Sequence, residues 1–235
     1  SGGSAEYLAG YGRKLAELVR AAAQVNSRSH SQVVAASPPV AEVVHSGDAR
    51  LIAIGSSTGG VEALQVLLGG FPANCPPTVV VQHINGAFAE AVARRLDASC
   101  APRICLAEPD IALKPGHVYL APGNERHLQV RGDRTFYTKM RAGDPVSGHR
   151  PSVDMLFHSV AQAAGAQAVG IQLTGMGSDG AQGLLAMRQA GAHTIAQDEA
   201  TCTVFGMPRA AIALGAAAEI AGIHQIARRA FAKAA

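Results

Sequence analysis

Short apolar runs alternate with amphipathic segments from Arg50 onward. Four runs are almost continuously apolar, as in strands buried on both faces of a parallel sheet: 51–55, 78–83, 168–173 and 193–197. Five segments have apolar residues at helical spacing: 60–69, 87–98, 151–164, 180–190 and 208–214. The alternation predicts an α/β fold with a doubly wound, mostly parallel, Rossmann-like sheet and helices on both of its faces.

The stretch 117–140 departs from this pattern. Its polar and apolar residues alternate more regularly, and it contains the turn signals Pro122-Gly123 and Gly132-Asp133. Alternation is typical of strands with one solvated face, and such turns join antiparallel strands. We therefore expect an antiparallel hairpin or meander around 117–140, either inserted in the sheet or at its edge.

The first 49 residues have a different character. Apolar residues at helical spacing over 5–24 predict one amphipathic helix within residues 1–24. Residues 25–49 lack this periodicity, are rich in Ser, Ala and Val, and contain Pro38-Pro39, which is typical of a linker. The remaining residues, 50–235, are predicted to form one α/β domain.

Composition and charge narrow the function classes. The 235 residues carry a formal net charge of +3, and only 4% are aromatic. Such a weak net positive charge, from scattered basic residues, and so few aromatic residues argue against binding of nucleic acid. The charge suits a partner with an acidic surface. The four cysteines contain no C-x-x-C pair, which indicates reduced thiols in a cytoplasmic protein. No apolar run is long enough for a membrane-spanning helix, so we expect no membrane insertion.

The loop Gly55-Ser56-Ser57-Thr58-Gly59-Gly60 joins the first predicted strand to the first predicted helix. It does not match the G-x-G-x-x-G pattern of dinucleotide sites, and no lysine follows as in a P-loop. It does match G-x-S-x-G with Ser57 at the centre, the turn that presents a nucleophilic serine. Because Ser/Gly-rich turns are common, a structural role stays open. So does a non-catalytic, Rossmann-like ligand-binding module that uses Gly55–Gly60 as an anion site.

A histidine and an aspartate follow two other predicted strands. His83 ends the strand after the Ser57 turn, and Asp179 lies in the glycine-rich turn after 168–173. The carboxyl ends of parallel strands meet at one edge of a sheet, where α/β proteins place their sites. We therefore expect Ser57, His83 and Asp179 to converge as nucleophile, general base and orienting carboxylate. Alternatively, His83 is a polar rim residue and Asp179 only caps the helix that begins near Gly180.

Other candidates are weaker. The backbone N–H of Thr58, directly after the nucleophile, is the predicted donor to an oxyanion. His149 and Arg150 precede a helix, where they either contact acidic substrate residues or order the loop, and Met207 is a candidate lining residue of the cleft. The histidines lack metal-ligand spacing such as H-E-x-x-H, so we expect no metal.

Seven sequence blocks resemble the catalytic domain of the CheB-type protein-glutamate methylesterases of bacterial chemotaxis: "IAIGSSTGG", "VVVQHI", "VYLAPGN", "HRPSVDMLFHSVA", "GIQLTGMGSDGA", "AGAHTIAQDEATC" and "VFGMPRAAI". The resemblance implies hydrolysis of glutamate γ-methyl esters on chemoreceptor helices, in many members also deamidation of glutamines, and no cofactor. It implies that Ser57, His83 and Asp179 form the triad. It also implies that the Met176-Gly177 segment supplies an oxyanion donor.

Members of this family usually carry an N-terminal receiver domain that a histidine kinase phosphorylates. Only the first 49 residues precede the first predicted strand. The resemblance therefore implies that the predicted 5–24 helix is the tail of an absent receiver, and that this chain is a deregulated catalytic domain. A related enzyme that serves a signalling array other than chemotaxis is an alternative with the same chemistry.

Overall fold

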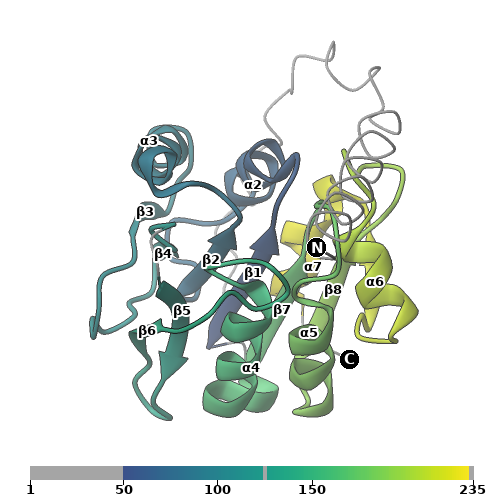
Figure 1. Ribbon diagram of the computed structural model, residues 1–235. Helices are drawn as coiled ribbons and strands as arrows, with labels where there is room; N and C mark the ends of the chain where they lie inside the picture. Colours follow the sequence, from purple (N-terminus) through teal and green to yellow (C-terminus); the bar gives the residue numbers. More distant parts are fainter. Residues whose placement is uncertain (1–49, 124–125, 233–235) are drawn as a thin grey trace, which may run out of the picture. The chain divides into compact units, whose positions relative to one another are not determined.

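The computed structural model describes residues 50–123 and 126–232 (Figure 1). The predicted helix within 1–24 and the predicted linker 25–49 lie outside the described residues. Neighbouring strands of the central sheet are all parallel, in the order β3-β4-β2-β1-β7-β8-β9. The strands are β1 (Leu51–Ser56), β2 (Thr78–Gln82), β3 (Arg103–Leu106), β4 (His117–Leu120), β7 (Ala168–Gln172), β8 (His193–Gln197) and β9 (Glu219–Ala221).

Helices cover both faces of this sheet, which confirms the predicted fold class. Along β1, Leu51 and Ala53 join one buried apolar cluster, whereas Ile52 and Ile54 join the other. Burying one such aliphatic side chain stabilises a fold by about 1.5–3 kcal/mol. The first cluster is covered by α4 (Val153–Ala164), α5 (Ala181–Gln189) and α6 (Met207–Ala213). The second is covered by α2 (Gly60–Gly69), α3 (Gly86–Asp97) and α7 (Ile223–Phe231).

The antiparallel pair exists, but the predicted range was wrong. It consists of β5 (Arg126–Arg131) and β6 (Tyr137–Ala142), which form a separate two-stranded sheet beside α4. His117–Leu120 is instead β4, a parallel strand between β2 and β3 of the main sheet. The reason is burial on both faces: Val118, Tyr119 and Leu120 are all buried, so the stretch is a short apolar run rather than an alternating one.

The edges of the sheet and the last helix were not predicted. Strands β3 and β9 are short and partly exposed, so their apolar pattern is weak. Helix α7 follows β9 and packs on α2, where the rings of Phe71 and Phe231 meet edge to face with centroids 4.8 Å apart. Within the described ranges, the structure contains no helix that is both long and apolar enough to cross a membrane.

The chain order of the strands fixes where a ligand can bind. From β1 the chain continues to β2 on one side, whereas from β7 it continues to β8 on the other side. The direction in which successive strands are added to the sheet therefore reverses between β1 and β7. In open α/β sheets the carboxyl ends of the strands at such a point form the binding crevice.

Candidate active site

The turn after β1 holds Ser57 at this edge of the sheet. Its backbone N–H donates to the carbonyl of Thr174, which follows β7, at 3.0 Å. The Gln82 amide crosses from β2: its Nε2 donates to the Ser57 carbonyl at 2.8 Å, and its Oε1 accepts from Ser56 Oγ at 2.7 Å. Gly60 makes room for this amide, because a Cβ there would lie 2.1 Å from Gln82 Oε1. The Ser57 turn is thus bonded to the ends of both neighbouring strands.

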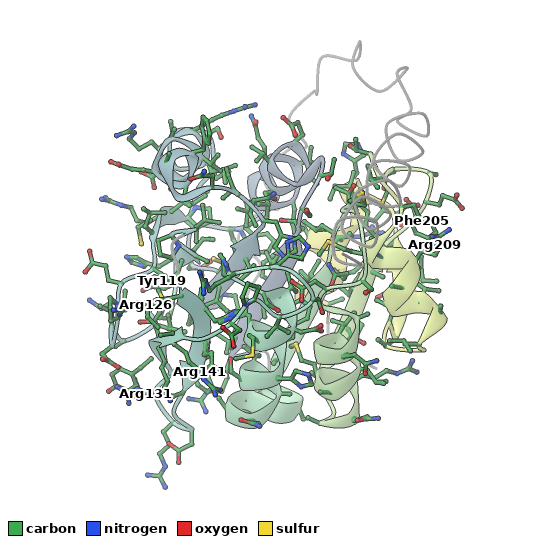
Figure 2. All side chains as sticks on the ribbon, in the orientation of Figure 1. Tyr119, Arg126, Arg131, Arg141, Phe205 and Arg209 are labelled. Atoms are coloured by element: carbon green, nitrogen blue, oxygen red, sulfur yellow. The ribbon has the colours of Figure 1, made fainter. Side chains whose placement is uncertain are left out.

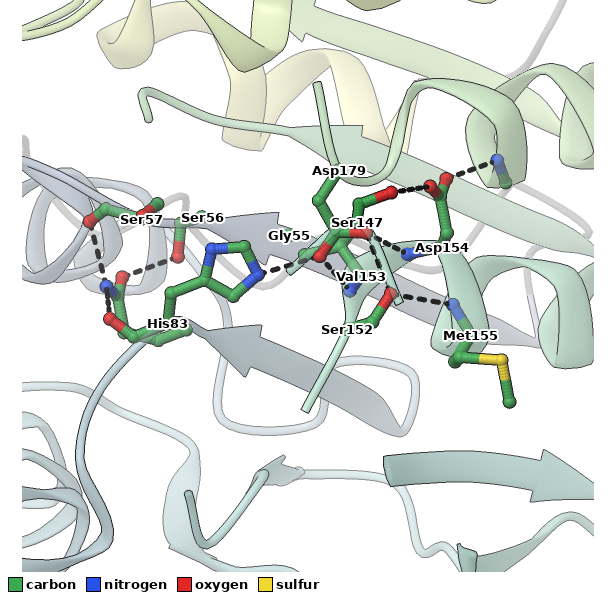
Figure 3. A network of polar contacts seen from close by, with 12 residues as sticks. Gly55, Ser56, Ser57, His83, Ser147, Ser152, Val153, Asp154, Met155 and Asp179 are labelled. Carbon is green, nitrogen blue, oxygen red and sulfur yellow. Dashed lines mark hydrogen bonds and ion pairs between the residues drawn. The ribbon is translucent and has the colours of Figure 1, made fainter. Parts of the chain in front are cut away.

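His83 lies directly beside this turn. Ser56 and Gln82 are paired in the β1–β2 ladder, and His83 N–H donates to the Ser56 carbonyl at 3.0 Å. The His83 side chain is 7% exposed, and its Nε2 lies 2.8 Å from Asp179 Oδ2. Its Nδ1 is buried and has no hydrogen-bond partner among the described residues. Figure 3 shows the His83 ring between Ser57 and Asp179, so the structure brings all three predicted residues together.

Asp179 is a buried carboxylate with four donors. Besides His83, it accepts from Ser152 Oγ at 2.7 Å, Val153 N–H at 2.8 Å and Asp154 N–H at 3.1 Å. Burial by itself raises the pKa of Asp179, but these hydrogen bonds, led by that from His83, outweigh it and hold the pKa below its ordinary value. A carboxylate can only accept, so the proton of the shared hydrogen bond belongs to His83 Nε2, and in the neutral imidazole Nδ1 carries the lone pair.

The same contacts correct one interpretation of the sequence. Asp179 does not cap the helix that follows it: the N-cap of α5 is Gly180, with φ 95° and no side-chain bond. It bonds instead to the first N–H groups of α4, at Val153 and Asp154. Ser152 is the N-cap residue of α4, and its hydroxyl also accepts from Met155 N–H at 3.4 Å. Asp179 therefore joins the start of α4 to the histidine.

Asp154 is a second buried carboxyl group beside Asp179. Burial raises the pKa of Asp154, and the nearby Asp179 charge adds to this, against the lowering effect of the Gly183 N–H. That N–H donates to Asp154 Oδ1 at 2.7 Å and so links α4 to α5. The environment thus pushes the pKa values of the two carboxyls apart, and the lowered pKa is that of Asp179, which faces His83.

The loop before α4 forms the wall of a cleft at His83. His149 stacks on His83 with ring centroids 3.7 Å apart and an interplanar angle of 7°. Arg150 donates from Nη1 to the Gly143 carbonyl at 2.8 Å, a contact that orders the loop. The cleft has a volume of about 330 Å³, and its lining is His83, Ile84, Asn85, Gly148, His149, Arg150 and Pro151. His149 and Arg150, the two weaker candidates from this loop, therefore both lie at the site.

The turns after β1 and β7 each offer backbone N–H groups at the site. Neither Thr58 nor Met176 donates its N–H to another described residue. The Thr174 hydroxyl ties their two turns together, since Oγ1 donates to the Thr58 carbonyl at 3.0 Å and accepts from Val204 N–H at 2.9 Å. Gly177, next to Met176, is exposed with φ 88°.

The prediction that Met207 lines the cleft was wrong. Its side chain is completely buried, and its sulfur packs against Gly175, where a Cβ would lie 2.2 Å from it. Met207 is the first residue of α6 and belongs to the core beneath the site. The buried thiols offer no alternative nucleophile, because burial raises the pKa of Cys75 to about 11 and of Cys202 to about 12.

Sequence reasoning missed a row of glutamines beneath the site. Gln82, Gln172 and Gln197 are the last residues of β2, β7 and β8. Gln172 Nε2 donates to the Gly55 carbonyl at 3.3 Å, and Gln197 Oε1 accepts from Thr174 N–H at 2.8 Å. The signal was present in the sequence, because each of these apolar strands ends in glutamine: TVVVQ, AVGIQ and HTIAQ.

Known proteins of one family are similar to this chain in sequence. The family model described as CheB methylesterase matches residues 52–230. The chain is 53% identical over 202 residues to protein-glutamate methylesterase/protein-glutamine glutaminase 1 of Rhizobium johnstonii, covering 86% of this chain and 58% of that protein. It is 46% identical to the protein-glutamate methylesterase/protein-glutamine glutaminase of Bordetella bronchiseptica, covering 93% of this chain and 63% of that protein.

A solved structure resembles the fold as well. The crystal structure of the Thermotoga maritima CheB methylesterase catalytic domain superimposes with a TM-score of 0.75 at 34% identity, covering 78% of this chain and 97% of that one. The chain spans about three fifths of the length of the curated relatives, at 58% and 63%. On the matched family model and these identities, the chain belongs to the CheB methylesterase family.

Proposed function

We propose that this chain is a serine hydrolase that removes the methyl group from glutamate γ-methyl esters of chemoreceptors, with Ser57, His83 and Asp179 as its triad. The observation that carries the proposal is the state of His83. Asp179 accepts the hydrogen bond from Nε2–H at 2.8 Å, so in the neutral ring the buried Nδ1 carries a lone pair beside the Ser57 turn. A buried base without a partner is poised to accept the proton of a serine hydroxyl. The comparisons offer no support for the non-catalytic alternative, an anion site at Gly55–Gly60.

The reaction then has two halves. Ser57 Oγ attacks the ester carbonyl while its proton moves to His83 Nδ1. The tetrahedral intermediate collapses, the C–O bond to the methoxy group breaks, and His83 returns the proton so that methanol leaves. A water molecule next gives a proton to Nδ1 and attacks the carbonyl carbon of the glutamyl ester of Ser57. As this second intermediate collapses, the bond from that carbon to Ser57 Oγ breaks and His83 returns the proton to Oγ, which releases the glutamate side chain and restores Ser57.

The charges that develop on His83 and on the oxyanion are stabilised by groups that are already in place. The Asp179 carboxylate stabilises the imidazolium that forms on His83 and fixes the orientation of the ring. Thr58, in the Ser57 turn, and Met176, in the turn after β7, have N–H groups that donate to no other described residue, and Gly177 follows Met176. One such donor to the oxyanion lowers the barrier by about 3 kcal/mol.

The same residues suit deamidation of glutamine. An amide differs from the ester in its leaving group, which departs as ammonia after His83 returns the proton. The names of the relatives in Rhizobium johnstonii and Bordetella bronchiseptica include protein-glutamine glutaminase. We include this second activity in the proposal, with the same three catalytic residues.

The wider setting is part of the proposal too. The substrates are the cytoplasmic helices of methylated chemoreceptors, which places the reaction in the cytoplasm. The four cysteines of the chain are all free, which suits that location. In the full-length protein of this proposal, an N-terminal receiver domain phosphorylated by a histidine kinase precedes the catalytic domain of residues 50–235.

Labelling with a fluorophosphonate probe tests the nucleophile. We expect the probe to form one adduct at Ser57, located by peptide mass spectrometry. Labelling should disappear in Ser57→Ala, slow strongly in His83→Ala, and persist in Ser178→Ala, an exposed serine of the neighbouring turn. Unchanged labelling of Ser57→Ala, or no labelling of the unaltered chain, would overturn the assignment.

A further inference from the structure

The positive charge of the chain is concentrated in one hairpin. Residues 126–142, which comprise β5, β6 and the turn between them, contain five basic residues and one acidic residue: Arg126, Arg131, Arg134, Lys139, Arg141 and Asp133. With His127 neutral, this segment carries +4, whereas the whole chain carries +3. The rest of the chain is therefore close to neutral. The excess of positive over negative charge lies in this hairpin, although 15 of the 20 Lys and Arg residues lie elsewhere in the chain.

The register of the hairpin places three of these side chains on one face. Leu128 and Val130 point inward and are buried in the core. The opposite face carries the pairs His127 with Arg141, Gln129 with Lys139 and Arg131 with Tyr137, and His127 is buried among them. Lys139 and Arg141 are exposed, and Figure 2 shows Arg131 and Arg141 on this part of the molecule. We call Arg131, Lys139 and Arg141 the basic face.

Lys139 and Arg141 make no ion pair with a described residue, whereas Arg131 is held in place. Its Nη2 lies 3.0 Å from Asp110 Oδ1, and its guanidinium carbon lies 5.0 Å from the centre of the Tyr137 ring. Two cations without an ion-pair partner among the described residues, next to a third that is already ordered, form a surface that attracts anions.

The basic face is continuous with the active-site cleft. Strand β6 runs directly into the loop 143–152, part of which lines the cleft. His127 is buried beneath this loop: its Nε2 donates to the Asp144 carbonyl at 3.0 Å, and its Nδ1 accepts from Ser152 N–H at 3.2 Å. Ser152 in turn donates to Asp179. The hairpin is therefore linked to the cleft by the loop 143–152 and by this series of hydrogen bonds.

We propose that the basic face binds an acidic helical surface of the same chemoreceptor that carries the ester, and that it holds this substrate at the cleft. The inference rests on the proposed function, in which the product is a glutamate carboxylate on a helix. Lys139 and Arg141 are two residues apart on a strand, which separates them by about 7 Å. Carboxylates at positions i and i+4 of a helix lie about 6 Å apart along its axis, so both cations can be matched at once.

Charge reversal of the two cations without an internal partner tests this inference. The variant Lys139→Glu/Arg141→Glu is compared with Arg209→Glu/Arg228→Glu, which changes the net charge equally at exposed residues of α6 and α7. The substrate is a soluble, methylated cytoplasmic fragment of a chemoreceptor, and methanol release is followed at low and at high salt. We expect the hairpin variant to raise KM about tenfold at low salt, with kcat unchanged. The difference should shrink at 0.5 M salt, and the control variant should behave like the unaltered chain.

Equal KM values for the two variants would overturn the inference. A rise in KM seen only with receptors embedded in anionic vesicles, and not with the soluble fragment, would also overturn it, because lipid would then be the partner. Fluorophosphonate labelling of Ser57 in each variant separates the two proposals. Normal labelling with unchanged KM rejects only the basic face, whereas loss of labelling and of methanol release from the unaltered chain rejects the proposed function itself.

Discussion

The ring of His149 lies flat on the ring of His83, with centroids 3.7 Å apart and planes within 7°. The two residues come from different elements, the loop before α4 and the end of β2. Stacking restricts rotation of the His83 ring and covers one of its faces. His149 thus acts on the histidine of the site, whereas the sequence suggested only a contact with substrate or a role in the loop.

Replacement of His149 separates these roles. We expect His149→Ala to lower kcat roughly 10- to 100-fold, because a small misplacement of a catalytic group costs a factor of this size. His149→Phe, which keeps a flat ring, should retain most of the activity. Steady-state kinetics on methylated receptor will show this, and a similar rise in KM for both variants with unchanged kcat would instead favour a contact with substrate.

Asp179 should matter for both catalysis and folding. In Asp179→Asn the amide no longer fixes the tautomer of His83, so we expect kcat to fall by about 10³–10⁴. The amide also satisfies fewer of the donors at Ser152, Val153 and Asp154, and the free energy of unfolding should fall by about 1–3 kcal/mol. Urea denaturation and kinetics measure the two effects. Ser57→Ala is the control, since its hydroxyl makes no hydrogen bond with the described residues and its loss should leave stability unchanged.

The two buried carboxyls should respond to pH with opposite signs. The folded-state pKa of Asp179 is lowered, so its stabilising contribution is complete above its unfolded value near 3.8 and is lost as the pH falls below that value. The stability deficit of Asp179→Asn should therefore be smaller at pH 3 than at pH 7. The folded-state pKa of Asp154 is raised, so its ionisation costs stability as the pH rises above 3.8. The free energy of unfolding of Asp154→Asn, relative to that of the unaltered chain, should consequently increase as the pH rises. If this difference changed in the same direction with pH for both variants, the assignment would be contradicted.

Gln82 should act through Ser57 without touching substrate. Gln82→Leu keeps the volume of the side chain but removes its bonds to Ser56 Oγ and to the Ser57 carbonyl. We expect kcat to fall about 10- to 100-fold with little change in KM, because the nucleophile is misplaced rather than removed. Fluorophosphonate labelling of Ser57 should slow in parallel. Gln225→Leu, an exposed glutamine on α7, is the matched control and should leave both rates unchanged.

Local pattern was sufficient for the central strands of the fold. The apolar runs of β1, β2, β7 and β8 lie within one residue of their predicted ends because these strands are buried on both faces. The hydrophobic pattern did not predict β3 and β9, because these strands are only partly buried. At His117–Leu120 a short apolar run was interpreted as an alternating one.

For the site, the strand ends predicted which residues converge but not how they are held. Ser57, His83 and Asp179 each follow a strand, so parallel topology alone brings them to one edge. The contacts of Asp179 with Ser152 and Val153 join residues 27 and 26 positions apart. The stacking of His149 joins the ends of elements that only tertiary packing brings together. No local period in the sequence encodes such contacts.

The most direct test of the account is methanol release from methylated chemoreceptor membranes, measured for this chain and for Ser57→Ala. We predict release by the unaltered chain and a rate at least about 10³-fold lower for the variant, as is typical when a catalytic nucleophile is removed. Equal release by both proteins would show that Ser57 is not the nucleophile, and no release by the unaltered chain would contradict the proposed methylesterase activity.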